Sequence, residues 1–258
     1  MTIFTTQILN KLDINQYLDS TYLKTPIQAG ISKEETHKNV IQLVQEAITE
    51  NFKLVMIRPR FVSLAKELVT KANSNVLVGT VIGFHEGTLS TEDKLIEAKQ
   101  AIDDGADELD FVINYPAFLN GNINLIKSEV FKGSKLGLEH GKIVKWIIEI
   151  AALSNDEIIA IAQLIKDVVL SNFGDKSADK IFVKSSTGFY KTSDNKPSGA
   201  TFEAMKLIIE NAKPLQVKAA GGVKNYEDAI KMINLGVNRI GTSSAKAIAD
   251  GQEVKNDY

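Results

Sequence analysis

Short apolar runs rich in β-branched residues recur along the whole chain. Such runs are typical of β-strands. Several of them, including GTVIGF and KWIIEI, are apolar on both faces, which is typical of a parallel sheet covered by helices. We therefore predict eight parallel strands, over residues 17–21, 53–57, 76–82, 108–113, 143–148, 180–184, 215–218 and 238–241.

Helical patterns with recognisable ends separate most of these strands. Ser90, Ser154 and Asn225 are each followed three residues later by an acidic residue, as a helix N-cap often is. Gly105 and Gly236 stand where a glycine commonly ends a helix. Strands and helices are therefore expected to alternate throughout.

The number of strand–helix units decides the fold prediction. Eight units in about 250 residues match a (β/α)8 barrel. We predict a single (β/α)8 TIM barrel domain over residues 1–258, with an extra N-terminal helix and a C-terminal helix and tail at 245–258. A doubly wound open sheet is the alternative, but residues 17–26 lack the glycine-rich turn of that fold.

Composition narrows the classes of function. The 30 basic and 32 acidic residues give a net charge of -2, without the basic excess that nucleic acids or anionic membranes require, so a small-molecule partner is expected. The absence of cysteine excludes a disulfide framework and a cysteine nucleophile. We find neither a signal peptide pattern nor ~18 consecutive apolar residues, and we expect a cytoplasmic protein.

Two lysines lie at the ends of consecutive predicted strands, and alternate residues of a barrel strand face inward. In KIFVKSSTG, Ile181 and Val183 suit the side that faces the helices, which leaves Lys184 inward at the C-terminal rim. In PLQVKAAGGV, the same alternation turns Val217 outward and Lys218 inward. We therefore expect the two amines to be neighbours at the end of the barrel where active sites lie.

This pairing of lysines indicates covalent chemistry. Neighbouring strands lie ~4.8 Å apart, so two ammonium groups at matching heights repel each other, and burial disfavours their charge further. One amine is then expected to titrate unusually low. A neutral amine can form a Schiff base with a carbonyl substrate. Either lysine taken singly is better explained as a solvated rim residue or an ion-pair partner.

A carboxylate is predicted beside the two amines. In ADELDFVINY, Leu109 and Phe111 suit the helix side and Asp110 projects inward. There it could transfer the protons that Schiff-base chemistry requires. Lys145 and Glu149 share the inward parity, so a plain ion pair between Asp110 and Lys145 is the alternative.

Two glycine-containing turns follow the last two predicted strands. The first contains Gly221 and Gly222, and the second runs from Gly241 through Ser243 and Ser244. Barrel enzymes often bind phosphate between these loops through backbone N–H groups and hydroxyls. We predict a phosphate site there, with an ordinary helix-start glycine and a serine cap as the alternative.

Several of these segments resemble a known family. ADELDFVINY, VKSSTGF, VKAAGGV and RIGTSS, together with GTVIGF and LDSTYLK, resemble the deoxyribose-phosphate aldolases over residues 19–244. The resemblance implies a class I aldolase that reversibly cleaves 2-deoxy-D-ribose 5-phosphate to acetaldehyde and D-glyceraldehyde 3-phosphate, in deoxyribose catabolism. It implies no metal and no cofactor, and it suggests a homodimer or a larger homo-oligomer.

The resemblance also implies roles for individual residues. Lys184 is implied as the Schiff-base nucleophile, Lys218 as the group that lowers its pKa and donates a proton, and Asp110 as the proton relay. The residues implied to bind the substrate and its phosphate are Thr187, Gly188, Gly221, Gly222, Ser243 and Ser244.

The sequence departs from the family pattern at four positions. Ser20 stands where a histidine is expected, Met56 near an expected cysteine, His85 at an expected proline and Ile150 at an expected threonine. None of them is an implied catalytic residue. The chain ends in the polar segment VKNDY, in which Tyr258 could fold over the site or remain disordered.

Other functions fit part of the same residue pattern. A transaldolase or a larger ketose-phosphate aldolase would share the lysine and the phosphate site, and a phosphate-binding barrel without chemistry would share the turns alone. A zinc-dependent class II aldolase is disfavoured because His37, His85 and His140 show no paired metal-ligand spacing.

Overall fold

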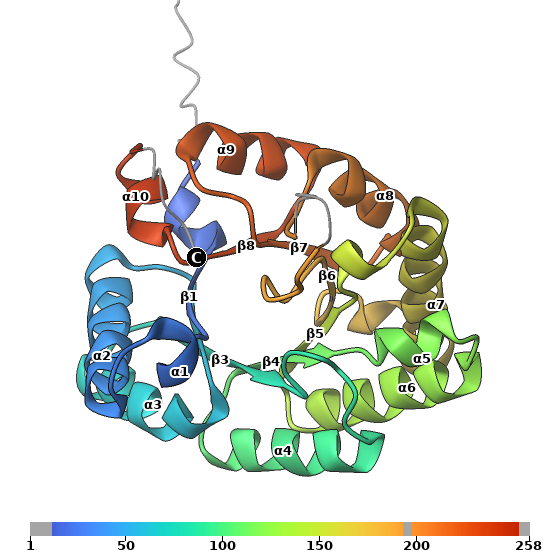
Figure 1. Ribbon diagram of the computed structural model, residues 1–258, viewed down its shortest axis with the longest axis horizontal. Coiled ribbons are helices and arrows are strands. Elements are labelled where there is room, and N and C mark those ends of the chain that lie inside the picture. The colour runs from blue at the N-terminus through green and yellow to red at the C-terminus, as the bar shows by residue number, and fades with distance from the viewer. Residues whose placement is uncertain (1–11, 193–197, 253–258) are drawn as a thin grey trace, which may run out of the picture.

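Eight parallel strands close into a barrel in a computed structural model that describes residues 12–192 and 198–252. Each strand pairs with its neighbours in chain order, and the last pairs with the first, so the sheet has no edge (Figure 1). The predicted TIM barrel is confirmed, and the predicted strands end within two residues of the observed ones. The strands are β1 (Leu18–Tyr22), β2 (Leu54–Ile57), β3 (Leu77–Ile82), β4 (Glu108–Val112), β5 (Ile143–Ile147), β6 (Ile181–Lys184), β7 (Gln216–Ala220) and β8 (Arg239–Thr242).

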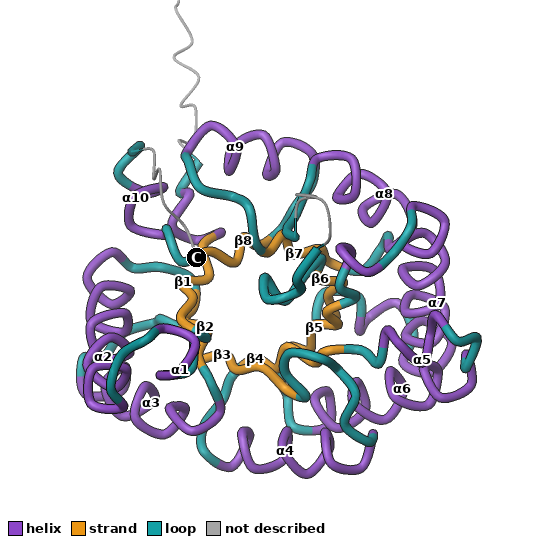
Figure 2. The backbone as a smooth tube through the Cα atoms, viewed as in Figure 1, coloured by secondary structure: helices purple, strands orange, loops and turns teal. Residues whose placement is uncertain are grey.

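Helices form a ring around the strands (Figure 2). Ser90, Ser154 and Asn225 each cap a helix by accepting a hydrogen bond from the third residue of that helix, as predicted. The α-helices are α1 (Pro26–Ala29), α2 (Lys33–Glu50), α3 (Val62–Lys71), α4 (Thr91–Asp103), α5 (Tyr115–Leu119), α6 (Ile123–Glu139), α7 (Asn155–Phe173), α8 (Phe202–Ala212), α9 (Tyr226–Leu235) and α10 (Ala245–Ala249). Short 3-10 turns are η1 (Ile14–Tyr17), η2 (Pro59–Phe61), η3 (Ile150–Ala152) and η4 (Asp175–Ser177).

The two ends of the chain are described only in part. Before β1, the described residues form the 3-10 turn η1 rather than an α-helix, and the rest of the expected N-terminal helix falls on residues 1–11, outside the described ranges. At the other end, α10 is the expected C-terminal helix, while Tyr258 lies outside the described ranges. No described helix combines the length and the apolar character needed to cross a membrane.

Close packing of α6 on the barrel depends on two glycines. A Cβ atom at Gly137 would lie 2.1 Å from Val144 Cγ2, and one at Gly133 would lie 2.7 Å from the Trp146 ring. Trp146 in turn stacks on Phe111 at a ring-centroid distance of 5.0 Å. The outward side chains of β4 and β5 are thereby fixed, and the alternate residues of the same strands are held inward.

The interior of the barrel has two chemically different halves. Near β1, β2 and β3 a small apolar cluster consists of Leu23, Leu54, Met56 and Val81. The inward positions of β4 to β8 instead carry buried charged side chains. Since a barrel interior is normally filled by branched apolar residues, the charged half calls for a functional explanation.

Candidate active site

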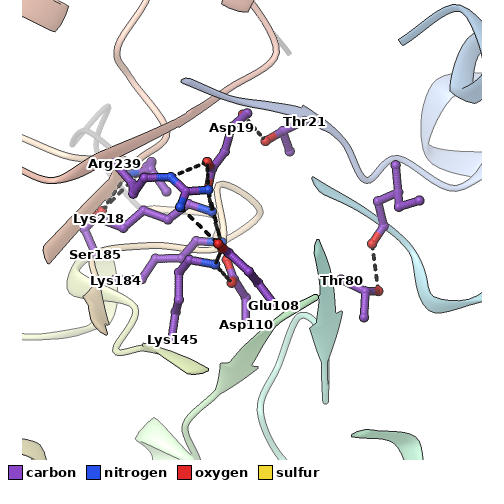
Figure 3. Close-up of polar contacts among 12 residues, drawn as sticks. Asp19, Thr21, Thr80, Glu108, Asp110, Lys145, Lys184, Ser185, Lys218 and Arg239 are labelled. Atoms are coloured by element: carbon purple, nitrogen blue, oxygen red, sulfur yellow. Dashed lines mark hydrogen bonds and ion pairs between the residues drawn. The ribbon is translucent and has the colours of Figure 1, made fainter. Parts of the chain in front are cut away.

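Seven charged side chains lie buried together inside the barrel (Figure 3). They come from β1 and from β4 to β8, while the alternate hydrophobic residues of these strands pack against the helices. Buried charges persist in proteins when they are paired with opposite charges. We refer to this cluster as the charged chamber, which consists of Asp19, Glu108, Asp110, Lys145, Lys184, Lys218 and Arg239.

Lys184 and Lys218 are direct neighbours in the chamber. The register of β6 and β7 pairs the two residues across the sheet. Asp110 Oδ2 lies between their amines, 2.8 Å from Lys184 Nζ and 3.0 Å from Lys218 Nζ. The structure therefore brings together the three residues that the sequence indicated for catalysis.

Asp110 also contacts a third lysine. Lys145 Nζ is 2.7 Å from Asp110 Oδ1 and 2.5 Å from Glu108 Oε2. The ion pair that was the alternative explanation for Asp110 is thus present, but the other carboxylate oxygen faces the remaining two lysines. A proton could pass between Lys184 and Lys218 through this one oxygen.

Sequence reasoning missed the rest of the chamber. Arg239 Nε donates to Asp19 Oδ1 at 2.8 Å, and its Nη1 donates to Glu108 Oε1 at 3.0 Å. Asp19 Oδ2 forms a 2.5 Å ion pair with Lys218 Nζ. The sequence did contain a signal for two of these residues. Asp19 and Arg239 are charged residues in the first and last strands, and these strands become neighbours when the barrel closes.

Ion-pair counts distinguish Lys184 from the other cations of the chamber. Three carboxylates face four cationic groups, which leaves one surplus positive charge. Lys145, Lys218 and Arg239 each contact two carboxylates, whereas Lys184 contacts Asp110 alone. Loss of a proton from Lys184 therefore removes the surplus charge while sacrificing the least attraction.

The protonation equilibria agree with this count. Burial is the main cause that lowers the pKa of Lys184 from 10.5 to about 8; the attraction of Asp110 opposes it, and repulsion from Lys218 adds to it. Burial would raise the pKa of Asp110, but the three lysines hold it well below its usual range. Near neutral pH the chamber thus contains a carboxylate beside an amine that is partly uncharged.

A cavity of about 590 Å³ opens at the C-terminal end of the barrel. Lys184 is the chamber residue that reaches it, while Asp110 and Lys218 do not line it. Of the residues predicted to hold the substrate and its phosphate, the lining includes Thr187, Gly188, Gly221, Gly222 and Ser243. Ser244 is not in the lining; it is buried, and its backbone N–H donates to Thr242 Oγ1 at 3.0 Å.

Other cavity residues were not anticipated. Lys224 lines the cavity and is, with Lys184, one of two charged side chains in the lining formed by the described residues. Residues 198–202 also line it from the long connection after β6, where no turn motif marks them. A Cβ atom at Gly199 would lie 2.4 Å from the backbone of Gly221, so this connection approaches the β7 turn closely.

None of the four departures from the family pattern is itself a residue of the cavity lining. Ser20 is buried in β1, Met56 belongs to the apolar cluster, and Ile150 begins the turn η3. His85 stacks on Phe189, which does line the cavity, at a centroid distance of 5.5 Å. Within residues 12–192 and 198–252, no group of three or more His, Asp or Glu side chains is arranged to bind a metal.

Comparisons with known proteins agree on one family. Residues 14–128 match the model of the DeoC/LacD family aldolases. The chain is 39% identical to deoxyribose-phosphate aldolase of Thermococcus kodakarensis over 94% of this chain and 98% of that protein. It is 37% identical to the Mycoplasma capricolum enzyme of the same name, over 96% and 100%. The solved tetrameric structure of deoxyribose phosphate aldolase from Aeropyrum pernix superposes with a TM-score of 0.73 at 30% identity, covering 92% of this chain and 90% of that one. The chain therefore belongs to the deoxyribose-phosphate aldolase family.

Proposed function

We propose that the protein cleaves 2-deoxy-D-ribose 5-phosphate reversibly to acetaldehyde and D-glyceraldehyde 3-phosphate through a Schiff base on Lys184. The observation that carries the proposal is the position of this amine. Lys184 reaches the cavity, contacts a single carboxylate and has a pKa lowered to about 8. Lys218 and Lys145 each have two carboxylate partners.

The first half of the reaction builds the imine. Neutral Lys184 attacks the aldehyde carbon of the open-chain sugar, the nitrogen loses a proton, and the carbonyl oxygen gains one to give a carbinolamine. Departure of this oxygen as water requires a second proton and leaves a protonated imine. Asp110 Oδ2 contacts both amines, so it can carry protons between Lys184 and Lys218.

The second half breaks the carbon–carbon bond. The hydroxyl on the third sugar carbon loses its proton, the bond between the second and third carbons breaks, and the electron pair passes to the imine to form an enamine. Glyceraldehyde 3-phosphate leaves at this point. Protonation of the enamine carbon and hydrolysis of the imine then release acetaldehyde and restore neutral Lys184. Asp110 is present as a carboxylate but does not line the cavity, so it can take up this proton only through an intervening water.

The phosphate is assigned to the end of the cavity near the turns after β7 and β8. Gly221, Gly222 and Ser243 line this end, as does the cationic side chain of Lys224. Both glycines have positive φ, +75° and +82°, a backbone conformation that favours glycine. The Gly221 N–H donates to Gly241 O at 3.4 Å, so the phosphate is assigned to the Gly222 N–H together with Lys224. Ser244 is not in the cavity lining, and its backbone N–H donates to Thr242 Oγ1 within the same turn.

Borohydride trapping tests the mechanism. The protein is reduced in the presence of acetaldehyde or 2-deoxyribose 5-phosphate, and the modified lysine is located by peptide mass mapping. The adduct is expected on Lys184, and Lys184→Arg, which keeps the charge, should abolish it. An adduct on Lys218 instead would reassign the nucleophile. A larger ketose phosphate is expected to give no adduct; trapping with it would favour another Schiff-base aldolase.

Further properties of the whole protein complete the proposal. We propose that residues 1–258 form one domain that acts in the cytoplasm, in deoxyribose catabolism, without metal or cofactor. We also propose a homo-oligomer, since the Aeropyrum pernix relative is tetrameric. Light scattering after gel filtration tests the oligomer, and a single cooperative unfolding transition is expected for one domain.

A further inference from the structure

Glu149 is a buried acidic residue that the mechanism above does not use. It follows β5 with only 1% of its surface exposed, and its backbone has a positive φ of 56°, which is uncommon for a residue other than glycine. The backbone on either side pairs with the end of β6, through Ile148 N to Lys184 O and Ile150 N to Ser185 O. The carboxylate is therefore held against the segment that follows the proposed nucleophile.

The hydrogen bonds of this carboxylate go to one residue of the cavity wall. Glu149 Oε2 accepts from the backbone N–H of Thr187 at 3.2 Å and also from the Thr187 hydroxyl. Glu149 Oε1 is buried and has no hydrogen-bond partner among the described residues. Thr187 lines the cavity together with Lys184. Loss of the carboxylate should therefore act on the cavity mainly through Thr187.

The contacts of Thr187 fix the polarity of its hydroxyl. A threonine hydroxyl has one proton and two lone pairs. The proton is donated to Glu149, and one lone pair accepts the backbone N–H of Phe189 at 3.0 Å. What remains is a lone pair, so this hydroxyl can accept a hydrogen bond from a ligand but has no proton to donate. A group that only accepts hydrogen bonds gains nothing there, whereas a hydroxyl of the substrate does.

We propose that Glu149 is a positioning residue that holds the Thr187 hydroxyl as an acceptor for a hydroxyl group of the sugar chain. The inference rests on the proposed cleavage of a deoxysugar phosphate, because acetaldehyde, the other partner of Lys184, has no hydroxyl to donate. Glu149 thereby contributes to recognition of the hydroxylated part of the substrate. It takes no part in forming the Schiff base.

Cleavage of 2-deoxyribose 5-phosphate and trapping of acetaldehyde both use Lys184, but only the sugar has hydroxyl groups. Comparing the two reactions therefore separates a positioning role from a merely structural one. For Glu149→Met, the KM for 2-deoxyribose 5-phosphate is expected to rise about tenfold, the effect of one lost hydrogen bond, with a smaller change in kcat. Glu149 and Lys184 also attract each other electrostatically, so acetaldehyde trapping is compared at about pH 10, where Lys184 is neutral in both proteins. There its rate should stay within about twofold of the unaltered protein. Glu149→Gln keeps an acceptor oxygen and should recover most of the lost affinity.

Substitutions of Thr187 test the same contact without disturbing Glu149. Thr187→Val removes the hydroxyl at nearly constant shape and should reproduce the rise in KM, while Thr187→Ser should not. In the double variant the two effects should not add, because they remove one interaction. Glu129→Gln is the matched control: it alters a buried carboxylate that also accepts a backbone N–H, outside the barrel, and should leave the ratio of the two activities unchanged.

Each outcome bears on a different claim. Equal losses of sugar cleavage and acetaldehyde trapping in Glu149→Met and Thr187→Val would overturn the positioning role and leave the proposed function standing. An unchanged KM in both variants would overturn it as well. Absence of any Lys184 adduct in the unaltered protein would instead overturn the proposed function, and this inference with it.

Discussion

Replacement of Lys218 by methionine tests how the chamber keeps its nucleophile uncharged. The substitution retains an unbranched side chain and removes one ammonium group. Three cationic groups then face three carboxylates, so the surplus charge that favours loss of the Lys184 proton disappears. The Asp110 oxygen that the two lysines share becomes available to Lys184 alone. Both changes should raise the pKa of Lys184.

The size of the effect follows from the geometry. Both amines lie within 3.0 Å of Asp110 Oδ2, so they are at most about 5.8 Å apart. At an effective dielectric constant of about 20, two unit charges at that distance repel by about 3 kcal/mol, or about two pKa units. Because burial is the larger cause of the low pKa, we expect Lys218→Met to raise the pKa of Lys184 from about 8 by about one to two units.

The assay is the pH dependence of borohydride trapping with acetaldehyde between about pH 6 and pH 10. Trapping requires neutral Lys184, so its rate should rise with pH, with a midpoint near the pKa of about 8 in the unaltered protein. In Lys218→Met the midpoint should move to higher pH. At pH 7 the neutral fraction should then fall from about one tenth to about one hundredth or less.

A matched lysine outside the barrel controls for a general effect of losing a positive charge. Lys66 lies in α3 and pairs with Asp107 at 2.8 Å, away from the chamber. Lys66→Met should leave the midpoint unchanged. A midpoint that also stays near pH 8 in Lys218→Met, or moves lower, would refute the assigned role of Lys218.

Three further results are expected. Asp110→Asn removes an attraction that raises the pKa of Lys184, so the trapping midpoint should move to lower pH, while kcat for sugar cleavage falls by about 10²–10⁴ because proton transfer is lost. Lys224→Met should raise KM for 2-deoxyribose 5-phosphate by about tenfold or more while leaving acetaldehyde trapping unchanged; equal effects on both would place the phosphate elsewhere. Gly137→Ala should lower the free energy of unfolding in urea by about 1–3 kcal/mol despite the better helix propensity of alanine, because the new methyl group would overlap Val144, and a gain in stability would contradict this packing.

The strand pattern predicted the inward residues because alternation is a local property. One or two hydrophobic residues on the helix side of each strand were enough to turn Lys184, Lys218 and Asp110 inward, and the structure finds all three there. Consecutive strands of a TIM barrel are neighbours, so sequence order also predicted the contact between Lys184 and Lys218.

Contacts between distant strands could not be obtained in this way. Asp19 and Arg239 are 220 positions apart and meet because the barrel closes between β1 and β8. Ser243 and Ser244 belong to the same predicted phosphate turn, yet only Ser243 lines the cavity, while the backbone N–H of Ser244 donates to Thr242 Oγ1. No pattern within a short segment shows which distant residues meet or which residue of a turn faces the cavity.

The amino-acid sequence by itself determined the barrel, the inward parity of its charged residues and the family resemblance, because all three are encoded in short segments and their order. Strand parity left the two lysines equivalent and the resemblance implied Lys184, but only the tertiary structure supplies a physical reason for preferring it. That assignment depends on burial and on the number of carboxylates around each amine, and both arise when residues from six strands are packed into one chamber. Lys184 differs from Lys218 by its surroundings, since the two side chains are chemically identical.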